Sequence, residues 1–153
     1  MKKVIVYYSK YGSTKDYAEW IAQDTGAELV PFAQARKLDL AAYDAIAFGC
    51  PFYAFKLKIA GYVKSRASQF AGKKVAFFAV GAEPPESPEV HKRYEACLPE
   101  EVRSRISLFF LPGRVAMGKM GFLDRTVMRM MKAKDFDHTS RAAIAPIVEF
   151  LRG

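Results

Sequence analysis

The chain has 153 residues, of which 51% are apolar, and it carries a formal net charge of +8. This length predicts one domain over residues 1–153, and the sequence contains neither a membrane-spanning apolar stretch nor the apolar core of a signal peptide. The two cysteines, Cys50 and Cys97, offer no disulfide framework and no metal-ligand spacing, so we expect a cytoplasmic protein without a metal site.

Apolar runs rich in β-branched and aromatic residues alternate with helical patterns along the chain. Residues 4–8 predict a buried strand, and Ser13 or Thr14 is expected to cap a helix that stops at Gly26. The last helix lies within residues 140–152, where Pro146 must either kink it or mark its true start. Between these we expect, in chain order, strands over 28–32 and 45–48, a helix over 56–68, a strand over 74–80, a helix over 88–97 and a strand over 106–111.

Five strands separated by helices predict an α/β protein, because parallel strands need helical crossovers that cover the faces of the sheet. For so short a chain, a doubly wound five-stranded parallel sheet with order 2-1-3-4-5 and helices on both faces fits best. Such sheets bind ligands at the carboxyl ends of the strands, where the strand order reverses. This rule selects three loops, residues 9–14, 50–55 and 82–87.

The first of these loops joins a predicted strand to the start of a predicted helix. Backbone N–H groups at a helix start, together with the helix dipole, form an anion site. Hydroxyl side chains add donors, and a glycine lets the backbone wrap closely around a ligand. The same residue types also serve as ordinary caps and turns, so the pattern alone leaves both interpretations open. The loop consists of Ser9, Lys10, Tyr11, Gly12, Ser13 and Thr14.

Residues 7–15 resemble the FMN phosphate loop of flavodoxins, which runs hydroxyl, any residue, Thr, Gly, any residue, Thr. Tyr11 departs from that pattern because it replaces the usual Thr. Residues 48–54 and 121–132 are similar to the branch of this family that contains the menaquinone-dependent protoporphyrinogen oxidases. In that branch a Tyr follows the third strand, and an Asp-Arg pair opens a Met-rich basic helix after the fifth. The resemblance covers essentially the whole chain and implies a flavodoxin-like fold with bound FMN.

The resemblance also implies where the isoalloxazine ring of FMN lies. Tyr53 occupies the family's Tyr position and is expected to stack on the ring, with Pro51 and Ala54 shaping its loop. For Phe52, stacking on the ring and packing on the core are equal alternatives. Main-chain groups of the loop after the fourth strand hold the pyrimidine edge in family members. The expected cofactor-binding residues are Ser9, Lys10, Tyr11, Gly12, Ser13, Thr14, Pro51, Phe52, Tyr53, Ala54, Gly81, Ala82 and Glu83.

A basic, methionine-rich insertion over residues 113–134 precedes the last helix. It contains six Lys or Arg residues and one acid, a local charge of +5, and five of the six methionines. The resemblance places the start of a helix at Asp124 and Arg125. On that helix an apolar face lies opposite a basic one. The apolar face carries Leu123, Val127, Met130 and Met131, and the basic face carries Arg125, Arg129 and Lys132.

Three interpretations of this insertion remain open. Basic charge opposite a flexible apolar face suits peripheral contact with an anionic lipid surface, which would be the inner face of the membrane. Methionines also suit an adaptable wall for a large apolar ligand such as a quinone or porphyrin. The third interpretation is a helix that packs on the core and leaves its basic face in solvent, with the Asp-Arg pair as a local cap and ion pair.

The resemblance implies an FMN-dependent oxidoreductase that uses a quinone, and protoporphyrinogen IX dehydrogenase of heme biosynthesis is the nearest functional model. No side chain stands out as an acid or a base, so the catalytic residues stay unassigned. Arg114 is a candidate substrate contact, displaced from the Leu-Arg that family members carry. One alternative is a small electron-transfer flavodoxin without its own substrate, although such carriers are usually acidic. Another is a basic membrane-surface module. We expect no nucleic-acid partner, and the sequence leaves the oligomeric state open.

Overall fold

Five parallel strands form the central sheet in the computed structural model, which describes residues 1–53, 56–115, 120–130 and 135–153. They pair in the order β2-β1-β3-β5-β6, and each of these neighbours is parallel. Counted along the chain, this is the predicted order 2-1-3-4-5, so the predicted fold class is confirmed. The strands are β1 (Lys3–Tyr7), β2 (Glu28–Pro31), β3 (Ala45–Tyr53), β5 (Lys74–Gly81) and β6 (Ser107–Pro112).

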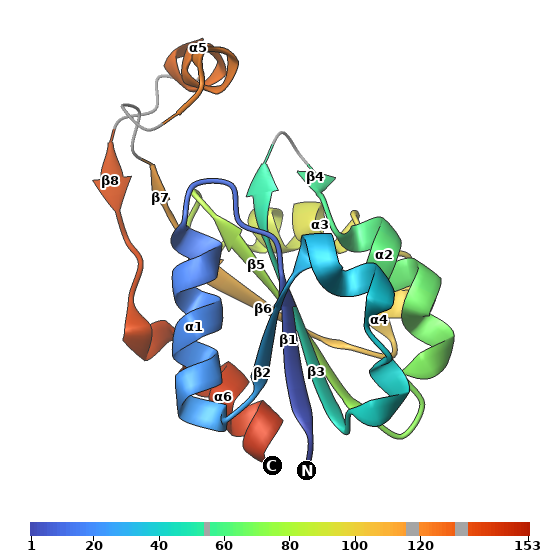
Figure 1. Cartoon of the computed structure of the whole chain (residues 1–153). Coiled ribbons are helices and arrows are strands. Elements are labelled where there is room, and N and C mark those ends of the chain that lie inside the picture. The colour runs from blue at the N-terminus through green and yellow to red at the C-terminus, as the bar shows by residue number, and fades with distance from the viewer. Residues whose placement is uncertain (54–55, 116–119, 131–134) are drawn as a thin grey trace.

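Helices cover both faces of this sheet, as Figure 1 shows. On one face lie α1 (Ser13–Thr25) and α6 (Ala145–Arg152). The other face is covered by α2 (Ala60–Arg66), α3 (Pro88–Glu95) and α4 (Glu100–Arg103). Short 3-10 helices occur in the connections, over Phe32–Lys37, Leu40–Ala42, Ala67–Gln69 and Arg141–Ile144.

The side chains of β1 illustrate how the sheet serves two cores. Ile5 packs with the helices of the α1 face, whereas Val4 and Val6 point to the opposite layer. All three side chains are buried, and burial of an aliphatic side chain of this size contributes about 1.5–3 kcal/mol. Because both faces of the sheet are covered, its inner strands consist of continuous apolar runs.

The loop after β3 differs from the prediction. β3 continues to Tyr53, five residues beyond the predicted strand over 45–48, and then turns back as β4 (Lys56–Leu57). β4 pairs antiparallel with the end of β3, in the register Phe52↔Leu57. The predicted helix over 56–68 is therefore wrong at its start, and α2 begins only at Ala60. Leu57 and Ile59 are both buried at a spacing of two residues, which is the period of a strand.

The predicted cap of the first helix is also wrong. Ser13 is already the first residue of α1, and the residue before it is Gly12, whose φ of 98° is left-handed. Among the described residues, no side chain forms a capping hydrogen bond at this end of the helix. At the other end of the chain, Pro146 lies in the first turn of α6 and so marks its start, one of the two predicted alternatives.

Between β6 and α6 the chain leaves the sheet as a two-stranded ribbon. β7 (Arg114–Val115) and β8 (Phe136–Asp137) pair antiparallel, and α5 (Phe122–Met130) lies beyond them, above the carboxyl ends of the strands (Figure 1). A small third core holds this part together. It contains Val115, Met120 and Met128, packed against Tyr11 and Phe136.

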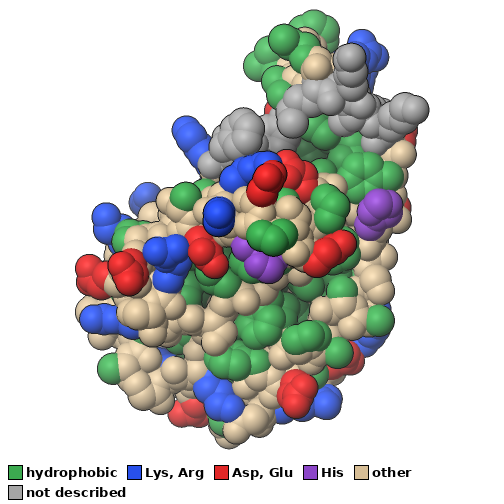
Figure 2. Space-filling view, turned by 180° about the vertical axis from the view of Figure 1, so that it is seen from behind, with side chains coloured by type: hydrophobic (Ala, Val, Ile, Leu, Met, Phe, Trp, Pro, Cys, Tyr) green, Lys and Arg blue, Asp and Glu red, His purple; other side chains and the backbone are tan. Residues whose placement is uncertain are grey.

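The outer face of α5 is apolar and exposed. Figure 2 shows hydrophobic side chains gathered at the top of the molecule, over this helix. The exposed fractions are 79% for Phe122, 77% for Leu123, 44% for Val127 and 80% for Met130. Of the three interpretations of this helix, packing of its apolar face on the core does not hold for Leu123, Val127 and Met130, which are exposed, and Met131 lies outside the described residues. Within the described part of the chain, no helix is long and apolar enough to cross a bilayer.

Candidate functional site

A cavity of about 290 Å³ lies where the carboxyl ends of β1, β3 and β5 meet the ribbon and α5. Nine of the predicted cofactor-binding residues line it, and they come from all three predicted loops. Met120, Val127 and Met128 of the insertion also line the cavity, so α5 contributes a wall. The nine predicted lining residues are Lys10, Tyr11, Ser13, Thr14, Pro51, Phe52, Gly81, Ala82 and Glu83.

The other four predicted residues are placed differently. Ser9 and Gly12 belong to the same turn as the lining residues, and the Ser9 hydroxyl accepts a hydrogen bond from the Gly12 N–H at 3.1 Å. Tyr53 ends β3, but its side chain lies outside what the structure describes, and so does Ala54. The predicted stacking of Tyr53 therefore stays a prediction.

The turn before α1 is built to receive an anion. Gly12 adopts the left-handed conformation, and the N-terminal amides of the thirteen-residue α1 follow directly. The Thr14 side chain is 1% exposed, and its hydroxyl has no hydrogen-bond partner among the described residues. A buried hydroxyl without a partner costs roughly 1–3 kcal/mol. An acceptor placed in this turn would remove that cost.

Arg114 supplies a positive charge at the same turn. A Cβ atom added to Gly12 would lie 2.8 Å from Nη2 of Arg114, so the guanidinium occupies the space that any other residue would fill. Its Nη1 donates to Oδ2 of Asp16 at 2.7 Å, in the first turn of α1. The sequence indicated Arg114 only as a candidate substrate contact and did not predict its place beside Gly12, because the two residues of the ion pair are 98 positions apart.

The departure at Tyr11 has a structural reason. Its ring packs against the third core, and its hydroxyl donates to Oδ2 of Asp124 on α5. Lys10 Nζ lies 2.6 Å from the same carboxylate oxygen, which is largely shielded from solvent. Asp124 thus links the phosphate-loop candidate to α5, and a threonine at position 11 could not reach it.

Two residues of α3, Tyr94 and Arg93, fix the loop after β5. A Cβ atom on Gly81 would lie 1.8 Å from the Tyr94 hydroxyl, so only glycine permits this close approach. Burial raises the pKa of Tyr94 to about 12. Glu83 accepts two hydrogen bonds from Nη1 of Arg93, at 2.5 and 2.7 Å. Phe52 packs edge-on against Tyr94, with ring centroids 4.5 Å apart, so it packs on the core and also borders the cavity.

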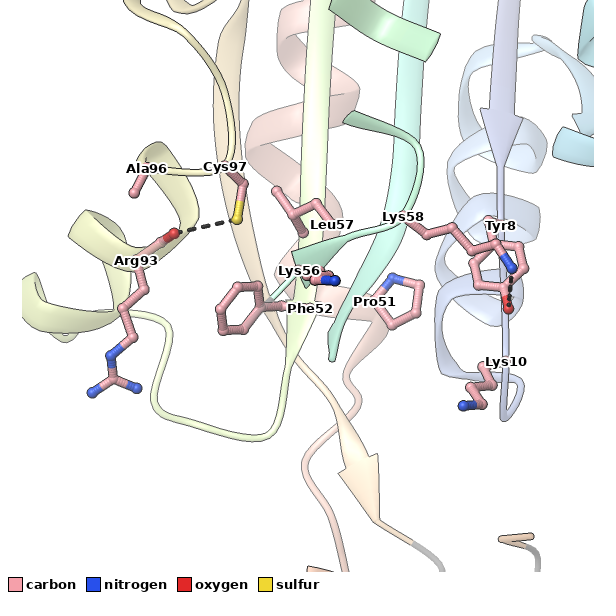
Figure 3. A pocket seen from close by; sticks show the side chains of 10 residues that line it. All are labelled: Tyr8, Lys10, Pro51, Phe52, Lys56, Leu57, Lys58, Arg93, Ala96 and Cys97. Carbon is pink, nitrogen blue, oxygen red and sulfur yellow. Dashed lines mark hydrogen bonds between the residues drawn. The ribbon is translucent and has the colours of Figure 1, made fainter. Parts of the chain in front are cut away.

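A second, larger hollow lies next to the cavity, and the two share residues at the end of β3. Its volume is about 810 Å³, and Lys10, Pro51 and Phe52 line both hollows. Figure 3 shows its basic side chains, among them Lys56 and Lys58 beside Pro51.

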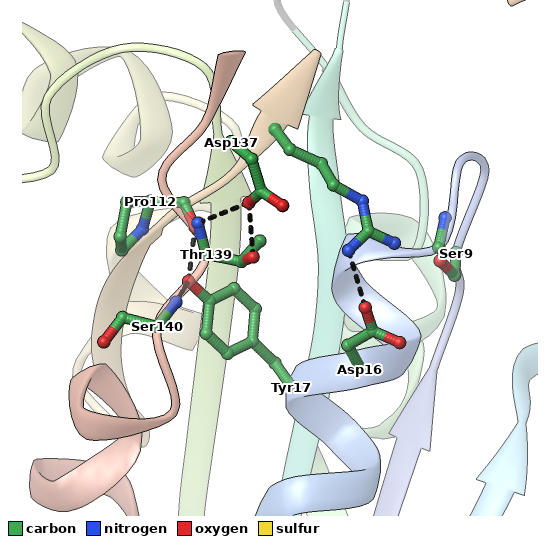
Figure 4. Close-up of polar contacts among 9 residues, drawn as sticks. Ser9, Asp16, Tyr17, Pro112, Asp137, Thr139 and Ser140 are labelled. Carbon is green, nitrogen blue, oxygen red and sulfur yellow. Dashed lines mark hydrogen bonds and ion pairs between the residues drawn. The ribbon is translucent and has the colours of Figure 1, made fainter. Parts of the chain in front are cut away.

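Tyr17 anchors the strand end from which the ribbon starts. Its ring is fully buried, and its hydroxyl donates to the Pro112 carbonyl while it accepts from the Ser140 N–H at 3.2 Å (Figure 4). These bonds join α1, the end of β6 and the segment that enters the last helices. The position of Arg114, two residues after Pro112, depends on this anchor.

Cys50 and His91 are held by burial and packing. Cys50 is fully buried, and this burial raises the pKa of its thiol to about 12. His91 stacks on Phe110, and its Nε2 contacts the Pro85 carbonyl. Within the ranges that the structure describes, no cluster of His, Cys, Asp or Glu could hold a metal ion.

A family model described as a flavodoxin domain matches residues 4–141. No curated protein matches the chain.

Three solved structures illustrate the similarity. The two-electron reduced flavodoxin of Megasphaera elsdenii is 24% identical, with 72% of this chain and 82% of that chain covered and a TM-score of 0.52. A flavoprotein in complex with FMN from Lactobacillus acidophilus is 18% identical, with 73% and 93% covered and a TM-score of 0.51. The rubredoxin oxygen:oxidoreductase of Desulfovibrio gigas is 16% identical with a TM-score of 0.49; the match covers 97% of this chain but 36% of that longer one.

The anchor role of Tyr17 predicts a loss of stability in Tyr17→Phe. The substitution removes a buried hydroxyl and leaves the Pro112 carbonyl and the Ser140 N–H without it. We expect the free energy of unfolding in urea to fall by about 1–3 kcal/mol. Tyr8→Phe is the control, because within the described ranges the Tyr8 hydroxyl has one hydrogen-bond partner, the exposed Lys58 ammonium at 3.4 Å. Equal stability of the two variants would contradict the assignment.

Proposed function

The chain belongs to the flavodoxin domain family, and we propose that residues 1–153 form one FMN-binding domain with oxidoreductase activity, in which residues 113–134 are an insertion. The observation that carries this proposal is the buried Thr14 hydroxyl without a partner, next to the left-handed Gly12 and the Arg114 guanidinium. These groups supply a hydroxyl donor, free amides and a positive charge within one turn. A phosphomonoester needs this combination.

The proposed phosphate site comprises Ser9, Lys10, Tyr11, Gly12, Ser13 and Thr14. Thr14 would donate its hydroxyl and the amides of the α1 terminus would donate their N–H groups to the phosphate. Arg114 would add a charge-assisted hydrogen bond without giving up its ion pair to Asp16, because only Nη1 takes part in that pair. The match between the donors and the ligand supports FMN rather than a flavin without phosphate.

The proposed ring site lies between the loops after β3 and β5. An isoalloxazine needs apolar contacts on its faces and backbone hydrogen bonds along one edge. Pro51 and Phe52 offer apolar surface, and Gly81, Ala82 and Glu83, whose main-chain groups would hold the polar edge, line the same cavity. Tyr53 and Ala54 belong to the same loop and stay in the proposal on the strength of the family resemblance.

FMN, when bound, supplies the redox chemistry, and the chain's residues bind and orient it. Met120, Val127 and Met128 would shield the cavity from water on the side of the insertion. Arg93 holds Glu83 in the loop after β5, and Asp124 holds Lys10 in the loop after β1, so ion pairs fix one loop of the ring site and the phosphate loop. We assign no acid or base to a side chain.

We further propose that the substrate is of the porphyrinogen type and the electron acceptor a quinone, as in heme biosynthesis. Loss of hydrogen from the substrate would be balanced by reduction of the quinone to a quinol. The similarity of residues 121–132 to the protoporphyrinogen oxidase branch supports this, as does the apolar wall that α5 gives the cavity. A small electron-transfer flavodoxin without a substrate is the alternative, and the net charge of +8 disfavours it, since such carriers are usually acidic.

The exposed face of α5 supports a peripheral site at the inner face of the membrane for a cytoplasmic protein. Phe122, Leu123 and Met130 are each more than three-quarters exposed, which is unusual for large apolar side chains. Arg129 is exposed in the last turn of the same helix. Apolar side chains with nearby basic charge bind anionic lipid surfaces, so we propose this contact as the means of access to a quinone dissolved in the bilayer.

The first test is the cofactor. We expect the purified protein to be yellow and to release FMN, identified by its mass. In Arg114→Gln, FMN affinity should fall about 10–100-fold, because a hydrogen bond between charged groups contributes roughly 1.5–3 kcal/mol. Riboflavin affinity should stay unchanged, because riboflavin lacks the phosphate.

Lys15→Gln is the matched control. Lys15 carries a positive charge in the first turn of α1, close to the proposed phosphate site, but its side chain is half exposed and pairs with Glu19. An equal loss of FMN and riboflavin affinity in Arg114→Gln would contradict the phosphate assignment. A colourless protein that binds no added FMN would overturn the proposed function altogether.

The second test is turnover. Anaerobic incubation with protoporphyrinogen and menaquinone should give fluorescent porphyrin in proportion to the FMN content of the preparation. FMN-depleted protein is the control. Reduction of bound FMN by a chemical donor, without porphyrin formation, would favour the electron carrier.

The third test is membrane contact. Sedimentation with vesicles of phosphatidylserine and phosphatidylcholine should exceed that with phosphatidylcholine alone and should weaken with salt. Arg129→Gln should lower binding about fivefold, since one basic residue near an anionic surface contributes roughly 1 kcal/mol. Arg36→Gln, which removes an exposed charge from a distant 3-10 helix, is the control and should bind like the unaltered protein. Equal binding to both vesicle types would argue against the contact.

A further inference from the structure

The hollow of about 810 Å³ beside the proposed ring site is lined by positive charge. Of the described residues that line it, four are basic and none is acidic. Two of these, Lys10 and Arg93, are balanced by ion pairs with Asp124 and Glu83. Among the described residues, Lys56 and Lys58 form no ion pair with a carboxylate, so the positive charge of the hollow resides on them.

Lys58 is held in position although its charge is not neutralised. Its Nζ lies 4.5 Å from the centroid of the Tyr8 ring and donates to the Tyr8 hydroxyl at 3.4 Å, as Figure 3 shows. An ammonium over an aromatic ring is stabilised by the ring's negative face but keeps its full charge. The backbone of Lys56 is placed by the pairing of β4 with β3. Lys58 follows β4 directly, so the two lysines stand two positions apart at the same edge of the hollow.

The remaining wall of the hollow is apolar. Pro51, Phe52 and Leu57 form one side, and Ala96 and Cys97 beyond the end of α3 form the other. A volume of about 810 Å³ lies in the range of small-molecule sites, roughly 300–1,000 Å³. A ligand that fits has an apolar body and an anionic group at the end that meets the lysines.

We propose that this hollow is a binding site for an apolar organic acid, whose carboxylate is recognised by Lys56 and Lys58. The inference rests on the proposed function for the role of the ligand, because Lys10, Pro51 and Phe52 also line the cavity assigned to the flavin. A ligand in the hollow therefore lies against the loop that borders the ring site. The two lysines would select acidic substrates, and the apolar body of such a ligand would lie against Pro51 and Phe52, which also line the cavity proposed for the flavin.

A pair of probes that differ only in charge tests this proposal. Isothermal titration calorimetry on the FMN-loaded protein compares 1-pyrenebutyrate with 1-pyrenebutanol, which share the ring system and the chain length. We expect the acid to bind at least about tenfold more tightly than the alcohol, and this preference to shrink as salt is added. In Lys56→Gln/Lys58→Gln the preference should disappear, while the affinity for the alcohol stays the same.

Two further variants separate recognition from general effects. Lys37→Gln/Lys64→Gln removes the same charge from exposed positions outside the hollow and should keep the preference for the acid. Lys56→Arg/Lys58→Arg keeps the positive charge and should retain most of the preference for the acid. Thermal unfolding checks that all variants are folded.

The outcomes distinguish this proposal from the flavin assignment. Equal affinity for acid and alcohol, or a preference that survives in Lys56→Gln/Lys58→Gln, would overturn the acid site even if the protein is fully loaded with FMN. Failure to bind FMN is seen separately, in the absorbance of the same samples. In that case a preference for the acid that depends on the two lysines would still establish the site, without its role beside a flavin.

Discussion

The site depends on one backbone conformation, the positive φ of Gly12. A chain that leaves a buried parallel strand and enters a helix must turn sharply, and the left-handed conformation makes that turn in a single residue. This conformation has two consequences for the anion site. The amides of the α1 terminus point outward without a side-chain cap, and the missing Cβ leaves room for the Arg114 guanidinium. A side chain at this position would both strain the turn and displace the arginine.

The insertion is attached to this turn rather than to the sheet alone. Tyr11 and Lys10 both bind the carboxylate of Asp124, and the Tyr11 ring packs in the same small core as Met120 and Met128. The wall that α5 contributes to the cavity is therefore positioned by the residues that surround the anion site. Val127 and Met128 of this helix line the cavity, so the insertion and the anion-binding turn form one structural unit.

The sequence predicted what depends on short-range pattern. The strand over residues 4–8 and its neighbours were recognisable, because a sheet covered on both faces requires apolar runs, and the strand order followed from their number. β4 was missed because Leu57, Ala60 and Val63 also fit a helical spacing, while the competing signal of Leu57 and Ile59 spans only three residues. A two-residue strand has no period long enough to detect.

The long-range contacts of the site could not be predicted in the same way. Tyr11 and Asp124 are 113 positions apart, so Tyr11 looked only like the loss of a hydroxyl contact with the ligand. Arg114 was recognised as unusual, but its place over Gly12 follows from the ribbon and from the Tyr17 anchor, which no local pattern reports. Residues of the loops were predictable because the topology brings the carboxyl ends of parallel strands together.

Three ion pairs fix the loops around the cavity. Each of these pairs joins an acid to a base from another element, so it fixes a loop and cancels its own charge. Lys56 and Lys58, which form no ion pair with a carboxylate among the described residues, add positive charge to the hollow beside the cavity. Because both side chains are exposed, salt screens this charge. The charge favours an acidic ligand in the hollow, which is the premise of the proposed acid site. The matched pairs are Asp16 with Arg114, Asp124 with Lys10, and Glu83 with Arg93.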